Sequence, residues 1–159
     1  MNHFAFGFTR LESPEDDIQT KLLDELGKAQ TKIRMIIYGF TLQPLVDLLI
    51  TKHKAGIDLK CILDLTQSKG VTERVQVQKL IDAGIDFIEG TSPVAGQIIH
   101  EKAIAIDDRQ LITGSYNFSA SAAKQVNHMD FIFSRELATD FSDVFDALYI
   151  QVKAEGHAI

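Results

Sequence analysis

The sequence predicts an α/β sandwich with a mixed, mostly parallel central sheet flanked by helices. Three observations carry this prediction. Apolar strand-like runs alternate with amphipathic helical runs over residues 13–89, the pattern of crossover helices on a parallel sheet. Two short strands joined by a tight turn then follow over residues 102–113, which adds an antiparallel hairpin. The length of 159 residues suits one domain, and we expect residues 1–159 to form it.

The first half of the chain supplies the alternating elements. Phe4, Phe6 and Phe8 alternate as in a half-buried strand, or as a platform for stacking bases. Ser13-Pro14 followed by two acids predicts the start of a helix that runs to residue 29. In order, we then expect a strand over 32–40, a helix over 44–55, a strand over 58–65, a helix over 72–83 and a strand over 85–89.

The second half changes the pattern. Strands over 102–107 and 110–113 flank an Asp107-Asp108-Arg109 turn, so they pair as a hairpin. A short helix over 119–124, a strand over 130–133 and an amphipathic helix capped by Ser134 complete the chain.

Composition narrows the class of protein. The chain is 45% apolar and 24% charged, as in soluble globular proteins, and no apolar run reaches the length of a membrane span. No signal peptide is visible, so we expect a cytoplasmic protein. The net charge of −6 argues against a nonspecific nucleic-acid binder, although a local basic groove is compatible with it. The single cysteine, Cys61, predicts a buried small hydrophobe and excludes an internal disulfide.

The segment from His100 to Ser119 carries the chemistry. His100 and Lys102 are two residues apart, so on a strand they share one face, while Glu101 faces away. Hairpin pairing would bring Ser115 and Asn117 close to them. An imidazole, an ammonium, an amide and a hydroxyl without a carboxylate on that face form a pocket for a phosphate oxyanion.

This segment resembles the phospholipase D superfamily. The superfamily motif is His-x-Lys, four residues, Asp, six residues, then Gly-Ser and a following Asn. Every spacing is kept by His100, Lys102, Asp107, Gly114, Ser115 and Asn117. Tyr38-Gly39-Phe40-Thr41 and Asp64 are also similar to segments of small members, and the closest likeness is to the small homodimeric endonucleases with a single motif.

The resemblance implies a mechanism. Two motifs meet across a twofold axis, one His attacks phosphorus to form a phosphohistidine, and the other His protonates the leaving oxygen. Lys102 and Asn117 would hold the non-bridging oxygens with Ser115 beside them, and neither a metal nor a cofactor is required. This chain has one such motif, and one imidazole cannot be nucleophile and general acid at once, so we expect a homodimer with one composite site.

Two site assignments stay open. Small members place a Glu eleven residues after the motif Asn, where it orients the catalytic His. This chain has His128 there, with Asp130 two residues on, and either residue is a candidate for that role. Asp107 belongs to the catalytic motif, yet two adjacent acids before Arg109 also suit a structural turn.

Three functions compete. The first is a nuclease that cleaves DNA or RNA. The second is a phospholipase D or cardiolipin-type lipid hydrolase, although no amphipathic helix with a basic face is visible. The third is a non-catalytic nucleic-acid-binding module, which only the altered orienting carboxylate favours.

Overall fold

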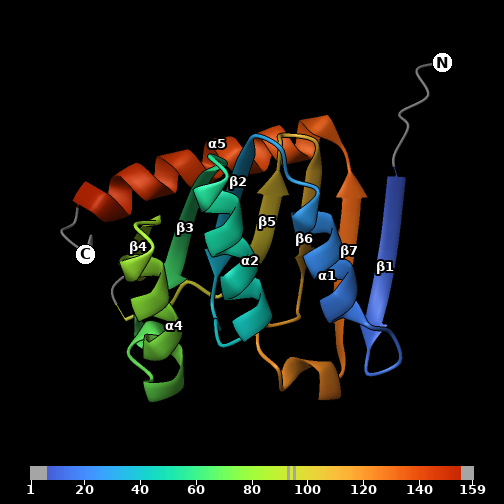
Figure 1. The fold of residues 1–159 in the computed structure, drawn as a ribbon, viewed down its shortest axis with the longest axis horizontal. Helices are drawn as coiled ribbons and strands as arrows, with labels where there is room; N and C mark the ends of the chain where they lie inside the picture. The colour runs from blue at the N-terminus through green and yellow to red at the C-terminus, as the bar shows by residue number, and fades with distance from the viewer. Residues whose placement is uncertain (1–6, 93, 95, 155–159) are drawn as a thin grey trace.

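A computed structural model describes residues 7–92, 94 and 96–154 of the chain, and Figure 1 shows its ribbon. One seven-stranded sheet forms the centre, with the strand order β1-β7-β6-β5-β2-β3-β4. The strands are β1 (Gly7–Ser13), β2 (Lys32–Ile37), β3 (Asp58–Asp64), β4 (Asp86–Gly90), β5 (Lys102–Ile106), β6 (Gln110–Gly114) and β7 (Asn127–Phe133). Phe4 and Phe6 of the predicted first strand lie outside the described residues.

Helices cover both faces of this sheet. One face carries α1 (Ile18–Gly27), α2 (Gln43–Lys54) and α4 (Val71–Asp82), and the long α5 (Arg135–Ala154) crosses the other (Figure 1). Two short elements are α3 (Leu65–Ser68) and the 3₁₀ helix η1 (Ala122–Lys124). The predicted α/β sandwich with a mixed sheet is therefore confirmed.

The strand pairings refine the prediction of a mostly parallel sheet. β2 pairs parallel with β3, and β3 with β4, whereas the pairs β2–β5, β5–β6, β6–β7 and β1–β7 are antiparallel. Most strands run in one direction, but β5 and β7 run oppositely and are interleaved among them. Antiparallel pairings consequently outnumber parallel ones.

The core divides into two layers because successive strand residues face opposite sides of the sheet. In β2, Ile33, Met35 and Ile37 pack toward α1 and α2, while Ile36 packs toward α5. The central strands are buried on both faces, which explains their continuous apolar runs. Cys61 is fully buried in the first layer, as predicted.

Two predicted boundaries are wrong. Ser13 ends β1 in register with Asn127 of β7, so the first helix starts only at Ile18, where the Asp17 carboxylate caps the backbone N–H of Thr20 at 3.0 Å. β2 ends at Ile37, three residues early, because Tyr38–Phe40 turns away to other partners. The predicted hairpin turn is confirmed, with Asp107 and Asp108 both at positive φ.

The topology brings the ends of several strands to one edge of the sheet. β2, β3 and β6 end there, and β5 and β7 begin there. Within the described residues, no helix has the length and apolar character needed to cross a membrane.

Candidate active site

An open groove of about 410 Å³ lies at this edge, where β5 begins and β6 ends. Its walls come from β5 with the residues before it, from β6 with the residue after it, and from β7. They are His100, Lys102, Thr113, Gly114, Ser115, His128 and Asp130. The fold thus brings together five of the predicted site residues, from positions up to 30 apart in sequence.

Lys102 is buried at the base of this groove. The residue is only 4% exposed. Its Nζ donates a hydrogen bond to the backbone oxygen of His100 at 2.6 Å. The Nζ also lies 4.7 Å from the centre of the Tyr38 ring, a cation–π contact. Burial lowers the pKa of Lys102. One hydrogen bond to a carbonyl leaves the ammonium with donors for an anionic ligand.

His100 is exposed, and its imidazole contacts the ring of Tyr38. The ring packs against Tyr38 with centroids 4.4 Å apart and planes inclined by 60°. Among the described residues, the imidazole has no hydrogen-bond partner. The preceding residue is fixed, since the N–H of Ile99 donates to Asp64 Oδ2 at 2.9 Å. The backbone is thus anchored while the ring nitrogens remain free for a substrate.

Gly114 and Ser115 connect β6 closely to β7. A Cβ atom on Gly114 would lie 2.9 Å from the Cα of Met129 and closer still to the carbonyl oxygen of His128, so only glycine fits. The Ser115 hydroxyl accepts from the N–H of His128 at 3.1 Å and lies 3.2 Å from Asn127 Oδ1. It is also 3.4 Å from Nδ1 of His128. The Gly-Ser pair therefore sets the spacing of the groove wall.

Asn117 is not among the residues that line the groove and lies next to the turn after β2. Its side-chain atoms are 3.6 Å from where a Cβ on Gly39 would stand. The Oδ1 is buried, and the amide forms no hydrogen bond within the described part of the chain. An unpaired buried amide is costly unless something completes it, so Asn117 is available to a polar ligand.

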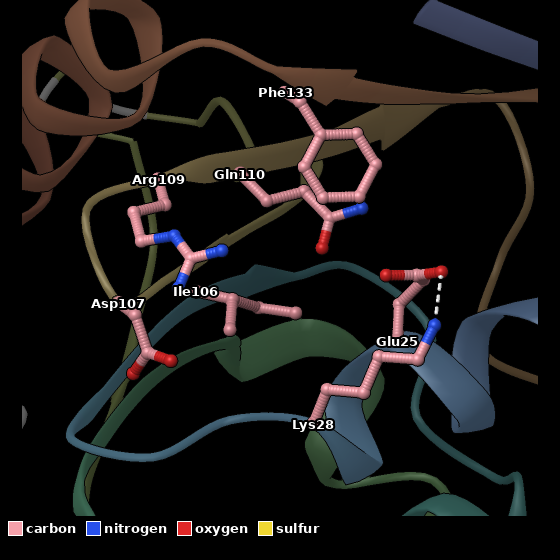
Figure 2. A pocket seen from close by; sticks show the side chains of 7 residues that line it. All are labelled: Glu25, Lys28, Ile106, Asp107, Arg109, Gln110 and Phe133. Atoms are coloured by element: carbon pink, nitrogen blue, oxygen red, sulfur yellow. Dashed lines mark hydrogen bonds and ion pairs between the residues drawn. The ribbon is translucent and has the colours of Figure 1, made fainter. Parts of the chain in front are cut away.

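Asp107 is not part of this site. It stands at the other end of β5, beside a separate pocket of about 70 Å³ (Figure 2). Its carboxylate accepts hydrogen bonds from the N–H groups of Gln30, Thr31 and Lys32 at 2.8–3.2 Å. Of the two roles left open for Asp107, this geometry favours the structural one, because the carboxylate holds the loop before β2 and does not line the groove of His100.

The candidates for orienting His100 are both in the groove but engaged elsewhere. Asp130 forms a bidentate ion pair with Arg10 of β1, at 2.6 and 2.7 Å. The Arg10 guanidinium, through these hydrogen bonds and its charge, lowers the pKa of Asp130 despite partial burial. His128 faces Ser115. Neither side chain is hydrogen bonded to His100 in the part of the chain that the structure describes.

Two contacts were missed by sequence reasoning. Arg10 reaches the site only because β1 pairs with β7, and a pairing across 120 residues leaves no local sequence signal. Tyr38 lies in a segment whose likeness to small superfamily members was visible, and that likeness could have identified it as a site residue.

Comparison with known proteins agrees with this geometry. The family described as "Cardiolipin synthase, PLD-like domain" matches residues 22–149. A phospholipase D of Rickettsia prowazekii is 31% identical over 76% of this chain and 57% of its own length. A mitochondrial cardiolipin hydrolase of Chlamydomonas reinhardtii is 26% identical over 84% of this chain and 58% of its own.

The chain thus spans little more than half the length of these curated relatives. Among solved structures, Nuc from Salmonella typhimurium, a phospholipase D family member, superposes with a TM-score of 0.84 and 26% identity. This superposition covers 92% of the present chain and 95% of Nuc. Both comparisons identify this chain as a member of the phospholipase D superfamily, carrying its PLD-like domain.

Proposed function

We propose that this protein is a metal-independent nuclease, which cleaves DNA or RNA through a phosphohistidine at a composite site in a homodimer. The superfamily acts on phosphodiesters. The observation that carries the proposal is that one open groove holds both His100 and the buried Lys102 ammonium. The His100 imidazole has no hydrogen-bond partner among the described residues.

The proposed chemistry has two displacements at phosphorus. The lone pair of the His100 imidazole attacks phosphorus, and the bond from phosphorus to the leaving oxygen breaks. His100 of the partner subunit, as imidazolium, gives that oxygen its proton. The partner's His100 then takes a proton from water, whose oxygen attacks phosphorus and breaks the P–N bond. Lys102 and the Asn117 amide stabilise the charge that develops on the non-bridging oxygens.

The requirement for two imidazoles supports the dimer. A neutral imidazole is needed for attack and a protonated one for the leaving group, and these are opposite states of the same side chain. His128 is a second imidazole in the groove of each chain, but its Nδ1 is directed at Ser115. We therefore assign the acid to the partner's His100 and give His128 a supporting place beside Ser115.

Chain mixing tests the composite site. Wild type and His100→Ala are mixed in equal amounts after dissociation and reassociation. If both imidazoles are required, only dimers of two wild-type chains are active. Random reassociation makes these about a quarter of all dimers, so about a quarter of the activity of an equal amount of pure wild type remains. A residual activity of one half would show that each chain carries a complete site.

Lipid cleavage is the second candidate, because the curated relatives named above are a phospholipase D and a cardiolipin hydrolase. Nucleic acid is favoured by the groove itself, which is open and lined by side chains that suit a polar backbone. The match to Nuc over nearly the whole length of both chains adds to this preference.

Substrate panels distinguish the two candidates. Labelled single-stranded DNA, duplex DNA, RNA and cardiolipin vesicles are incubated in excess EDTA with wild type, His100→Ala and the matched control His53→Ala, which lies in α2 away from the groove. Cleavage of a nucleic acid by wild type and the control alone supports the proposal. Cleavage confined to vesicles transfers the assignment to lipids, and strict dependence on added divalent metal contradicts the mechanism.

A further inference from the structure

Tyr38 contacts both reactive side chains of the groove. Its ring centre is 4.7 Å from the Lys102 ammonium, within the roughly 6 Å reach of a cation–π contact. The same ring meets the His100 imidazole edge-on with centroids 4.4 Å apart. Tyr38 is half-buried and follows directly after β2.

The turn that carries this ring is held from two sides. The N–H of Phe40 donates to the buried Glu73 carboxylate of α4 at 3.0 Å. The carbonyl of Gly39 accepts from the N–H of Phe118, next to Asn117, at 3.1 Å. The Tyr38 ring is therefore presented by a backbone tied to the segment that bears the site amide.

We propose that Tyr38 is a positioning residue of the active site, whose ring holds the Lys102 ammonium and the His100 imidazole in place and keeps the buried ammonium charged. This inference rests on the proposed phosphodiesterase function and extends it to a residue outside the superfamily motif.

The charges around Lys102 explain why a ring is suited to this role. Across the groove are His128 and Asp130 of β7, and Asp130 is held by Arg10. The residues just before Lys102 in the chain are His100 and Glu101, and Tyr38 is its neighbour from the turn after β2. No ion pair to Lys102 occurs among the residues that the structure describes.

A carboxylate in the place of Tyr38 would keep Lys102 protonated but would cancel its charge before the phosphate arrives. The face of an aromatic ring stabilises the cation and leaves the charge in place for the substrate. Burial lowers the pKa of Lys102, and the ring opposes that effect because it favours the charged form. Removal of the ring should therefore lower this pKa further.

The first test is the pH dependence of the Lys102 amine itself. Lysine labelled with ¹³C at Cε is titrated by NMR in wild type, Tyr38→Phe and Tyr38→Leu, with Lys102→Met to assign the resonance. We expect Tyr38→Phe to titrate as wild type, and Tyr38→Leu to titrate roughly one pH unit lower. This measurement needs no turnover, so it tests Tyr38 even if the proposed activity is absent.

The second test is the rate profile on bis(4-nitrophenyl) phosphate. In Tyr38→Leu the basic limb should move to lower pH together with the Lys102 pKa, and kcat should fall about tenfold from the misplaced imidazole. Tyr38→Phe should keep both. A wild type inactive on every phosphodiester would refute the proposed function alone, since the NMR titration still decides the role of the ring.

Thermal unfolding of each variant checks that it is folded, and Tyr38→Met serves as a second ringless variant with an unbranched, more flexible side chain. Titration of Lys102 at the wild-type pH in both ringless variants would overturn the proposal. So would a Tyr38→Phe variant as impaired as Tyr38→Leu, because the hydroxyl and not the ring would then be the functional part.

Discussion

Replacement of Asp107 separates a structural role from a catalytic one. In Asp107→Ala, three backbone N–H groups and the Thr31 hydroxyl lose a charged acceptor that now lies 2.8–3.2 Å away. Such bonds contribute about 1.5–3 kcal/mol each when buried, and these are partly exposed, so we discount the sum to about 2–3 kcal/mol. Asp107 also has φ of 54°, which costs alanine roughly another 1 kcal/mol.

Thermal unfolding measures this loss. For a chain of this length each 1 kcal/mol lowers Tm by about 2–4 °C, so Asp107→Ala should melt roughly 6–16 °C below wild type. Asp107→Asn is the matched control. Asparagine tolerates the left-handed conformation and keeps one acceptor oxygen, so this variant should lose less than half as much stability.

The pH dependence provides a further check. Burial alone would raise the pKa of Asp107, but the N–H groups of Lys32, Thr31 and Gln30 outweigh it and lower that pKa. A lowered pKa means that the stabilisation is present above the unfolded value of about 4 and is lost as the pH falls through the folded value. The difference in Tm between wild type and Asp107→Ala should therefore narrow under acid to the part that comes from the positive φ.

Activity completes the test. Below its melting range, Asp107→Ala should keep kcat within about threefold of wild type, because the carboxylate does not touch the groove. A hundredfold loss of kcat at unchanged Tm would refute the structural assignment and return Asp107 to the chemistry.

Three further outcomes follow from buried polar groups. Burial, helped by the charges of Asp64 and Glu89 and opposed by the Phe40 N–H, raises the pKa of Glu73 to about 7. The free energy of unfolding should thus fall as the pH rises from about 4.3 through 7. Glu73→Gln should therefore have a higher Tm than wild type at pH 8 but not at pH 4. An equal gain in Tm at both pH values would contradict this. Burial raises the pKa of Cys61 to about 12; a disulfide reagent should label it only on unfolding, and rapid labelling of the native protein would disprove its burial. Gln110 Nε2 is buried and unpaired among the described residues; Gln110→Met should raise stability by about 1 kcal/mol in urea titrations, whereas a loss would mean that this amide has a bound partner.

The sequence was sufficient to predict His100, Lys102 and Ser115 in one groove. Residues two apart on a strand share a face, and a tight turn between strands sets the register of their hairpin. Both relations are local, so spacing along the chain decides them. The predicted ends of the second and third helices, at residues 55 and 83, are likewise local and fall within one residue of the ends of α2 and α4, where Gly56 and Gly84 follow with positive φ.

The failures come from non-local contacts. The Ser13-Pro14 helix start looked sound locally, yet pairing of Ser13 with Asn127 placed it in a strand. Engagement of Asp130 by Arg10 likewise depends on the docking of β1 against β7. Sequence periodicity predicts which face a residue occupies but does not identify the partner that a distant strand will bring there.

The succession of β5, β6 and β7 has a consequence for how the site assembles during folding. These strands form a meander whose connections, residues 107–109 and 115–126, are local in sequence, so the loops that join them close at modest entropic cost and can form early. Tyr38 arrives with β2, which pairs with β5 across about 65 residues and is therefore a later, non-local event. A chain that has folded only its meander would hold His100, Ser115 and His128 together with an unsupported Lys102. The groove would then become catalytically competent only after β2 has joined the sheet. A partly folded molecule would be inactive although its motif is already assembled.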